Sequence, residues 1–198
     1  IPAGARILDA GAGELRNRQF CSHLEYVSQD FCQYEGQGDG NALQMGSWNT
    51  AAIDVVSDIS SIPLPDRSFD GIICTEVLEH VPNPLLALDE FARLLKPGGR
   101  LIITAPFCSL THFAPYHFAT GFSRYWYETH LGERGFSIEE ASSNGGWFDF
   151  VAQELWRVRY VGRRYSGSGV AAWAAMAMML PALLALRILK SLDKGSNE

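Results

Sequence analysis

The chain has 198 residues, of which 47% are hydrophobic and 12% aromatic, so it can form one domain with a full core. This composition excludes a disordered polypeptide. The net charge of −6 disfavours a protein that binds nucleic acid through its phosphate groups.

The four cysteines indicate neither a metal centre nor an oxidising compartment. None of them forms a Cys-x-x-Cys pair or a Cys/His pair at ligand spacing, so we expect no metal site. No signal peptide precedes the first expected strand, which favours a cytoplasmic location. Because the printed chain begins at Ile1, we expect that the natural N-terminus lies upstream.

A sharp turn near the start organises the expected fold. Ile7 and Leu8 form a short apolar run that ends at Asp9 and is followed by Gly11 and Gly13. This pattern is typical of a buried strand that leads through a tight loop into a helix. Glycine at both positions allows a ligand to approach the backbone closely, near the amides at the helix start. An ordinary strand-to-helix turn can carry the same glycine pair, so the motif alone identifies no ligand.

Two further strands are expected to end on acidic residues. After a short polar helix over residues 14–24, residues 25–30 alternate as a strand that ends at Asp30. Residues 53–58 form a third short strand, which ends at Asp58. Ligands of doubly wound sheets bind beyond the carboxyl ends of the strands. Asp30 is therefore placed to accept hydrogen bonds from ribose hydroxyls, and the alternative is a solvated loop aspartate.

The next strand, helix and strand follow at short intervals. Residues 68–75 are largely apolar, as expected for a strand that is buried on both faces. An amphipathic helix is predicted over residues 84–95, and the sequence Lys-Pro-Gly-Gly at 96–99 ends it. Residues 100–105 form the fifth strand. This alternation predicts an α/β fold with a Rossmann-like doubly wound sheet, mostly parallel.

The segment after the fifth strand is rich in aromatic residues. Residues 107–127 lie beyond the carboxyl end of a strand, where pockets form. A helix is predicted over residues 123–134. Residues 136–141 and 147–156 are then predicted as two strands joined by a short turn, which makes the last pair antiparallel.

At this point the sequence resembles the class I S-adenosylmethionine-dependent methyltransferases, most closely the type 11 group that contains the quinone-biosynthesis enzymes. The matching motifs occur in order between residues 5 and 106, at residues 7–13, 30, 58–59, 69–73, 76–81 and 94–101. The motifs EVLEHV and LLKPGG are far more specific for this family than the glycine turn is. The resemblance implies a sheet with the strand order 3-2-1-4-5-7-6.

The resemblance also implies a site for the cofactor S-adenosyl-L-methionine. Asp9, Gly11, Ala12 and Gly13 would shape the pocket for its methionine part. The residue two positions after Gly13 is usually glycine in the family, but it is Leu15 here. We expect the site to tolerate this departure, because backbone amides make most of the contacts.

The adenosine part would be bound at the ends of the second, third and fourth strands. Asp30 would hold the ribose hydroxyls, and Phe31 would lie beside the adenine. Asp58 would bind the adenine amino group, and the Ile59 amide would bind a ring nitrogen. The other flank would be lined by Thr75, Glu76 and Val77.

The predicted reaction is in-line displacement of the activated methyl group by a small-molecule acceptor. A general base is needed only if the acceptor carries a proton that must leave. The candidate bases are His80, His112 and His117, with Tyr116 as a weaker one. Each histidine also has a purely structural interpretation. In that interpretation His80 forms a structural hydrogen bond, and His112 and His117 are polar members of an aromatic lid.

The C-terminal part of the chain differs from the rest of the sequence in charge and polarity. Residues 157–198 carry seven basic and two acidic side chains, a net charge of +5, which leaves −11 for residues 1–156. Residues 167–186 have no charged side chain and would span roughly 30 Å as a helix. We therefore predict a methyltransferase domain over residues 1–156 and a basic, apolar helical tail over 157–198.

Three arrangements of this tail are considered. It contacts a membrane surface, packs on the domain, or forms a homodimer through residues 167–189. Membrane contact would suit a lipid-like or lipid-linked acceptor and a peripheral position on the inner face of a membrane.

Other functions are weighed against methyl transfer. A binding module or partner subunit could keep the fold without the chemistry, and Leu15 is the one departure that favours it. A nicotinamide-dependent dehydrogenase is disfavoured because GAGELR lacks the third glycine and because no Tyr-x-x-x-Lys occurs. Nucleic-acid methylation is disfavoured by the acidic body and by the lack of an Asn/Asp-Pro-Pro-Tyr/Phe motif after the fourth strand.

Overall fold

The computed structural model describes residues 1–34, 36 and 46–195. Part of the glycine-rich loop before the third strand therefore lies outside the described residues. The chain divides into two compact units, Ile1–Ile138 and Glu139–Glu198, which are described separately.

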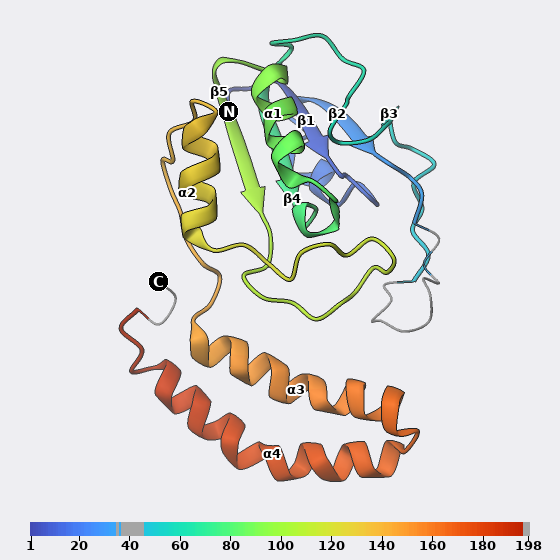
Figure 1. Ribbon diagram of the computed structural model, residues 1–198, viewed down its shortest axis with the longest axis vertical. Helices are drawn as coiled ribbons and strands as arrows, with labels where there is room; N and C mark the ends of the chain where they lie inside the picture. The colour runs from blue at the N-terminus through green and yellow to red at the C-terminus, as the bar shows by residue number, and fades with distance from the viewer. Residues whose placement is uncertain (35, 37–45, 196–198) are drawn as a thin grey trace. The chain divides into compact units, whose positions relative to one another are not determined.

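The first unit is built on a parallel sheet of five strands (Figure 1). The strands are β1 (Arg6–Ala10), β2 (Glu25–Asp30), β3 (Val55–Val56), β4 (Phe69–Thr75) and β5 (Leu95–Thr104). They lie in the order β3-β2-β1-β4-β5, and every neighbouring pair is parallel. The predicted Rossmann-like parallel sheet is thus confirmed, and the carboxyl ends of its strands lie along one edge.

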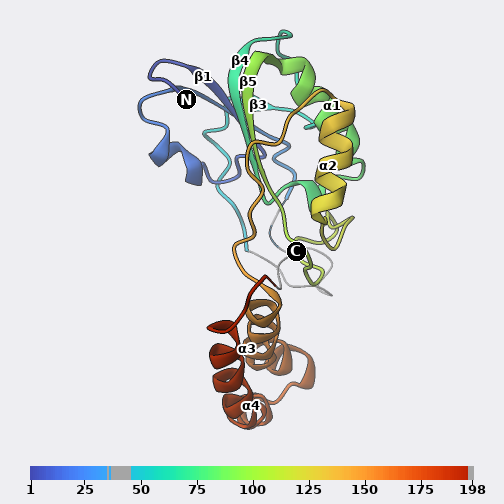
Figure 2. The same ribbon diagram turned by 90° about the vertical axis from the view of Figure 1, so that its left-hand side faces the viewer.

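Helices cover the two faces of this sheet unequally. The helices α1 (Pro84–Leu94) and α2 (Arg124–Glu133) lie on one face, whereas the short 3-10 helix η1 (Arg16–Phe20) lies on the other (Figure 2). Pro84 occupies the first turn of α1, where a missing amide hydrogen leaves no helix hydrogen bond unmade. The polar segment predicted as a helix over residues 14–24 forms only this 3-10 turn.

The hydrophobic core lies between the sheet and α1. Its fully buried side chains come from β1, β4, the 3-10 turn η2 (Leu78–His80) and α1, and include Leu8, Phe69, Ile72, Leu78, Leu88, Phe91 and Leu94. On β5, one of the two edge strands of the described sheet, Ile102 is 50% exposed. The core therefore fixes the middle of the sheet more firmly than its β5 edge.

The prediction of two strands after α2 is wrong. Residues 136–141 form no strand, and residues 147–156 belong to the helix α3 (Trp147–Ser166). The Gly146 amide donates to the carboxylate of Asp149, the third residue of α3, at 3.2 Å. Such a bond caps the first turn and starts a helix. The predicted antiparallel hairpin is therefore not formed. Residues 136–141 and 147–156 do not supply the strands 6 and 7 of the predicted order.

The second unit is a hairpin of two helices. Gly167, with φ of 68°, ends α3, and Ser168 caps the start of α4 (Gly169–Lys190) by accepting the Ala171 amide at 3.2 Å. At the far end, Lys190 pairs with Asp149 at 2.5 Å. The unit begins at residue 139, whereas the predicted boundary lies after residue 156.

Helix α4 is long and apolar enough to cross a membrane, by length and composition alone. It has 22 residues and a mean hydropathy of 1.9 over its most apolar window, of which 17% is buried. Pro181 lies inside the helix.

Candidate functional site

The glycine turn lies at the carboxyl end of β1 and is bonded to the end of β2. The amides of Gly11 and Ala12 both donate to the Gln29 carbonyl oxygen at 2.9 Å. The Gly13 amide donates to the Asp30 carboxylate at 2.9 Å. Gly11 and Gly13 have φ of 75° and 50°, in the left-handed region that favours glycine. The structure therefore brings these residues of the predicted cofactor site together.

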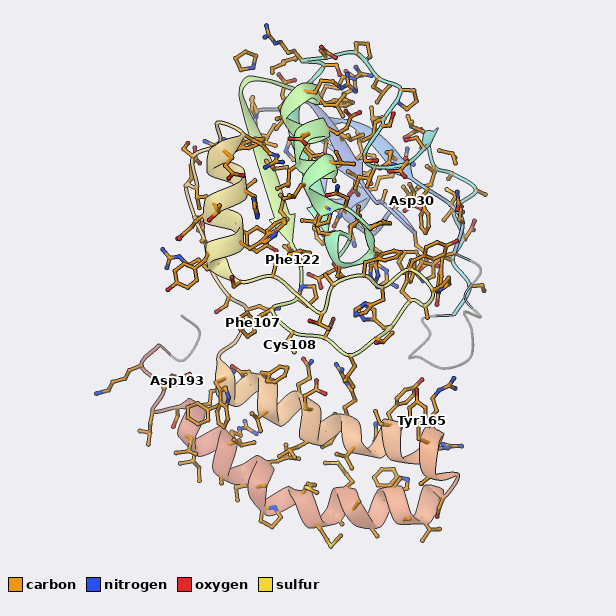
Figure 3. The ribbon with its side chains drawn as sticks, in the orientation of Figure 1. Asp30, Phe107, Cys108, Phe122, Tyr165 and Asp193 are labelled. Carbon is orange, nitrogen blue, oxygen red and sulfur yellow. The ribbon has the colours of Figure 1, made fainter. Side chains whose placement is uncertain are left out.

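Asp30 lies at the end of β2 (Figure 3), and it is almost fully buried. Its second oxygen accepts the Cys32 amide at 2.8 Å. The Cys32 thiol also hydrogen-bonds to this carboxylate. A carboxylate has about four acceptor positions, so the bonds made by the described residues leave room for a further donor. The side chain is thus a structural acceptor with unused bonding capacity.

Two side chains close over the glycine turn. A Cβ atom at Gly11 would come within 2.5 Å of Val77, and one at Gly13 would come within 2.6 Å of the Trp48 ring. Val77 belongs to the predicted flank of the site. Trp48 was not predicted, because it lies in a loop without a recognisable motif.

Asp9 is 1% exposed and is held by two side chains that were not predicted. The Tyr26 hydroxyl donates to one carboxylate oxygen, and the Asn17 amide donates to the other at 3.2 Å. Burial raises the pKa of Asp9, and these hydrogen bonds oppose the rise. Asn17 also donates to the Thr75 hydroxyl at 3.2 Å, so this network joins the ends of β1 and β4.

The predicted adenine-binding and flanking residues are less enclosed. The exposed Asp58 accepts hydrogen bonds from the amide and the hydroxyl of Ser60, at 2.8 and 2.7 Å. Ile59 is buried in the core. The exposed Glu76 accepts the Thr104 hydroxyl at 2.8 Å. These residues stand at the correct edge of the sheet, with their side chains engaged locally.

An aromatic cluster, formed by Phe31, Tyr34, Trp48, Phe113 and Tyr116, covers this edge. Phe113 stacks on Tyr34 with ring centroids 3.6 Å apart and lies 5.0 Å from Trp48. Phe31 meets Tyr116 edge to face at 4.9 Å. The cluster joins the segment after β2 to the segment after β5, whose aromatic character the sequence showed.

The three candidate bases form a second cluster, the histidine trio. The ring centroids of His80 and His112 lie 4.8 Å apart, and those of His112 and His117 lie 4.9 Å apart. The Nδ1 atom of His80 donates to the Tyr116 carbonyl oxygen at 2.6 Å. Burial lowers the pKa of His80 to about 4, and it also lowers the pKa of His117. These two imidazoles are therefore neutral at pH 7.

Glu79 lies beside the trio and has no predicted role, although it belongs to the EVLEHV motif. Its side chain is 1% exposed, and Oε1 lies 3.6 Å from Nε2 of His80. Its Oε2 atom has no hydrogen-bond partner among the described residues. Burial raises the pKa of Glu79 to about 7. The sequence signal that could have found it is an acid that stands between Leu78 and His80 in the EVLEHV motif.

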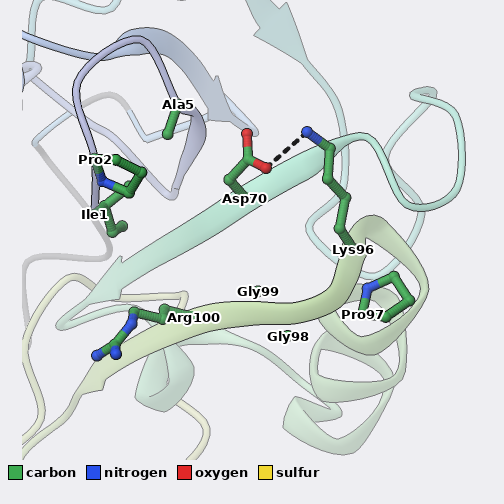
Figure 4. Close-up of a pocket in the computed structure, with 9 residues that line it drawn as sticks. All are labelled: Ile1, Pro2, Ala5, Asp70, Lys96, Pro97, Gly98, Gly99 and Arg100. Carbon is green, nitrogen blue, oxygen red and sulfur yellow. Dashed lines mark hydrogen bonds and ion pairs between the residues drawn. The ribbon is translucent and has the colours of Figure 1, made fainter.

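A hollow of about 370 Å³ lies at the opposite, amino-terminal edge of the sheet (Figure 4). It is lined by residues from the start of the chain, β4 and β5, and Lys96 pairs there with Asp70 at 2.7 Å. The hydrogen bond from Lys96 lowers the pKa of Asp70. Because the glycine turn and the trio lie at the other edge, this hollow is separate from them.

Comparisons with known proteins identify the class to which this arrangement belongs. Residues 8–103 match the family described as "Methyltransferase domain". The chain is 36% identical over 107 residues to the demethylmenaquinone methyltransferase of Clavibacter sepedonicus, covering 51% of this chain and 41% of that protein. It is 35% identical over 109 residues to the ubiquinone biosynthesis O-methyltransferase of Xylella fastidiosa (strain M23), covering 52% and 42%.

A solved structure shows the same fold. The YcgJ protein of Bacillus subtilis superposes with a TM-score of 0.54 at 19% identity, over 69% of this chain and 63% of that chain.

The matched segment, residues 8–103, is therefore a methyltransferase domain of the S-adenosylmethionine-dependent class, whose cofactor is S-adenosyl-L-methionine. The chain spans less than half the length of the two curated relatives.

Proposed function

We propose that the chain transfers a methyl group from S-adenosyl-L-methionine to a small-molecule acceptor at the carboxyl edge of its sheet. The observation that carries this proposal is the bond between the Gly13 amide and Asp30, which joins the glycine turn to the acid that follows β2. The turn lies within the segment that matches the methyltransferase domain.

The residues at this edge fit the cofactor in their chemistry. Gly11 and Gly13 keep the backbone free of Cβ atoms, and the unused lone pairs of Asp30 suit a ribose diol. Asp9, held by Tyr26 and Asn17, keeps the turn in place. For the cofactor to lie against Gly13, the Trp48 ring must move away from it.

The remaining cofactor residues keep the roles that the resemblance implies. The bound cofactor supplies an activated methyl group. Phe31 would flank the adenine, and Asp58 and Ile59 would bind its edge. Ala12, together with the flank formed by Thr75, Glu76 and Val77, would complete the pocket. The aromatic cluster would exclude water while the acceptor is aligned.

The acceptor side of the site is proposed to include the histidine trio. A general base must reach the acceptor's proton, and a neutral imidazole can accept one. Both nitrogens of His117 lack a hydrogen-bond partner among the described residues, which makes it the most available of the three. Tyr116 is weaker, because its carbonyl holds His80 and its ring packs on Phe31.

The acceptor is proposed to be lipid-like. The two relatives are named for demethylmenaquinone and for ubiquinone biosynthesis. Large apolar side chains of α4 are exposed, and Arg187 and Lys190 stand in its last turn. An apolar helix flanked by cations suits the surface of an anionic membrane. We therefore propose a cytoplasmic protein that is peripheral on the inner membrane face, with a homodimer through residues 167–189 as the alternative.

Calorimetric titration with S-adenosyl-L-methionine and with its demethylated product tests the cofactor proposal. We expect the wild-type chain to bind both ligands and Asp30→Asn to lose binding. The matched control, Asp70→Asn, changes the same side chain at the opposite edge of the sheet and should bind normally. No binding by a folded wild-type chain would contradict the proposal.

A second measurement separates the enzyme from the catalytically degenerate binding module or partner subunit. The protein is incubated with S-adenosyl-L-methionine that carries a labelled methyl group and with quinol-like or simple phenolic acceptors. The amount of labelled, methylated product is then measured. Transfer to one acceptor class supports the enzyme. Cofactor binding without transfer to any of them favours the binding module.

A further inference from the structure

We propose that His80, His112 and His117 bind a divalent transition-metal cation such as zinc. One candidate ligand nitrogen of each residue lies within 4.8 Å of the others. In a tetrahedral site with Zn–N distances of about 2.1 Å, the nitrogens lie about 3.4 Å apart. The rings therefore need to close by about 1.4 Å at most. This proposal does not depend on methyl transfer, and with a cation bound the three histidines act as its ligands in place of a general base.

The backbone already selects the ring nitrogens that would bind the cation. His80 donates from Nδ1 to the Tyr116 carbonyl at 2.6 Å, and His112 donates from Nδ1 to the Leu110 carbonyl at 2.8 Å. Each bond fixes the proton on Nδ1 and leaves the lone pair on Nε2. Metal-binding histidines characteristically donate their other nitrogen to a carbonyl or carboxylate in this way.

Buried polar atoms around the trio lack partners that a cation would provide. Both ring nitrogens of His117 are buried without a hydrogen-bond partner among the described residues, and so is Oε2 of Glu79. Such groups are rare in folded proteins and indicate a bound ion, a water or a functional role. Because Oε1 of Glu79 lies 3.6 Å from Nε2 of His80, a cation on that nitrogen would lie beside the carboxylate and be stabilised by its charge.

Two chain segments hold the ligands from different directions. His80 ends the η2 turn that follows β4, whereas His112 and His117 belong to the loop that follows β5. This loop is fastened to the first segment, because the amides of Phe118 and Ala119 both donate to the Glu79 carbonyl, at 2.8 and 3.2 Å. The ligands are therefore close to one another before any ion binds.

The donor set defines the class of ion and of further ligand. Imidazole nitrogen favours zinc, copper, iron and nickel over magnesium and calcium. Three protein ligands leave a fourth position for water or for an oxygen or nitrogen atom of a bound molecule, as in catalytic zinc sites. A site made only from histidine also explains why cysteine spacing gave no sign of it.

Titration of the full chain with Co²⁺, followed by displacement with Zn²⁺, tests the proposal. Visible absorption bands of Co²⁺ report its coordination, and a near-ultraviolet band would report a thiolate ligand. We expect one Co²⁺ per chain without a thiolate band. We also expect His112→Gln and His117→Gln each to weaken binding at least about tenfold.

The two histidines outside the trio supply matched controls. His23→Gln, in an exposed turn, and His130→Gln, on α2 beside Glu133, should bind Co²⁺ as the wild type does. Zn²⁺ should raise the melting temperature of the wild type and not of His112→Gln. The His112 substitution decides the matter if the His117 variant fails to fold. Absence of binding, equal affinity in all variants or a thiolate band would each overturn the proposal.

Discussion

The Gly13 amide donates to the Asp30 carboxylate at 2.9 Å, which joins the turn after β1 to the end of β2. The Cys32 amide donates to the other oxygen at 2.8 Å. One nearly buried carboxylate thus orders two loops at the proposed cofactor edge. Its structural role and its proposed ligand-binding role can be separated by experiment, because the first persists without cofactor.

Asp30→Asn should lower the free energy of unfolding by about 1–3 kcal/mol in the absence of cofactor. The substitution replaces one acceptor oxygen by an amide donor that faces a backbone amide. Urea denaturation of the wild type and the variant measures the difference. Asp58→Asn is the control, because Asp58 is exposed and its loss should cost less. Equal midpoints for Asp30→Asn and the wild type would contradict the structural role.

Gly11→Ala should destabilise the chain for two separable reasons. A residue with a Cβ pays about 1–2 kcal/mol at positive φ, and here the Cβ would also meet Val77 at 2.5 Å. Val77→Ala removes the colliding methyl groups. The double variant should therefore be more stable than the sum of the single effects predicts, as measured in a denaturant cycle. Additivity within about 0.5 kcal/mol would show that the contact carries no strain.

Leu15 has the backbone conformation that glycine usually takes. Its φ and ψ are 59° and 34°, in the left-handed region. Leu15→Ala removes the side chain and keeps this conformational cost, whereas Leu15→Gly removes both. Leu15→Gly should thus be about 1 kcal/mol more stable than Leu15→Ala in thermal or urea unfolding. An alanine variant as stable as the glycine variant would show that the backbone is unstrained there.

The central strands and α1 could be predicted because their apolar periodicity is local. The secondary structure of residues 147–156 could not be predicted, because their apolar pattern fits either a strand or a helix. The bond between the Gly146 amide and Asp149 favours the helix. In the candidate site, the glycine turn and Asp30 were singled out from the residues themselves, whereas the other cofactor residues were implied by the resemblance to the methyltransferases. The contacts of Asp9 with Tyr26 and Asn17 have no such signal, since they depend on how β1 lies against β2 and η1.

The histidine trio is another feature that the sequence could not predict, because it depends on contacts between distant segments. His80 and His112 stand 32 positions apart, and only the fastening of the loop at the Glu79 carbonyl brings them together. The sequence provided each residue as a separate candidate base. Their proximity, which makes a shared ion the better hypothesis, arises from an irregular loop that no periodicity describes.

Glu90 should make the stability of the first unit depend on pH. Its carboxylate accepts hydrogen bonds from Arg93, the main cause of its lowered pKa, and from the Ile62 amide at 2.6 Å. Because the pKa is lower in the folded than in the unfolded chain, the stabilisation is present at neutral pH. It is lost as the pH falls through the lowered pKa.

The Glu90→Gln variant measures this contribution. It should be less stable than the wild type by about 2 kcal/mol at pH 7, and the difference should shrink at pH 3. Glu128→Gln is the control, because the exposed pair with Arg124 one helical turn away should contribute about 0.5 kcal/mol or less. A difference between wild type and Glu90→Gln that stays constant across this range would contradict the assignment.

The exposed apolar surface of α4 should bind anionic vesicles. Leu184 is 62% exposed and lies near Arg187, so an aspartate at this position would place a negative charge in the proposed contact. Leu184→Asp should reduce co-sedimentation with vesicles that contain anionic lipid, whereas Leu86→Asp, on the exposed face of α1, should leave it unchanged. Added salt should weaken binding, because the cations beside α4 contribute to it. If the wild type stays in the supernatant at low salt and its mass doubles with concentration, the helix forms a dimer interface and the membrane proposal is wrong.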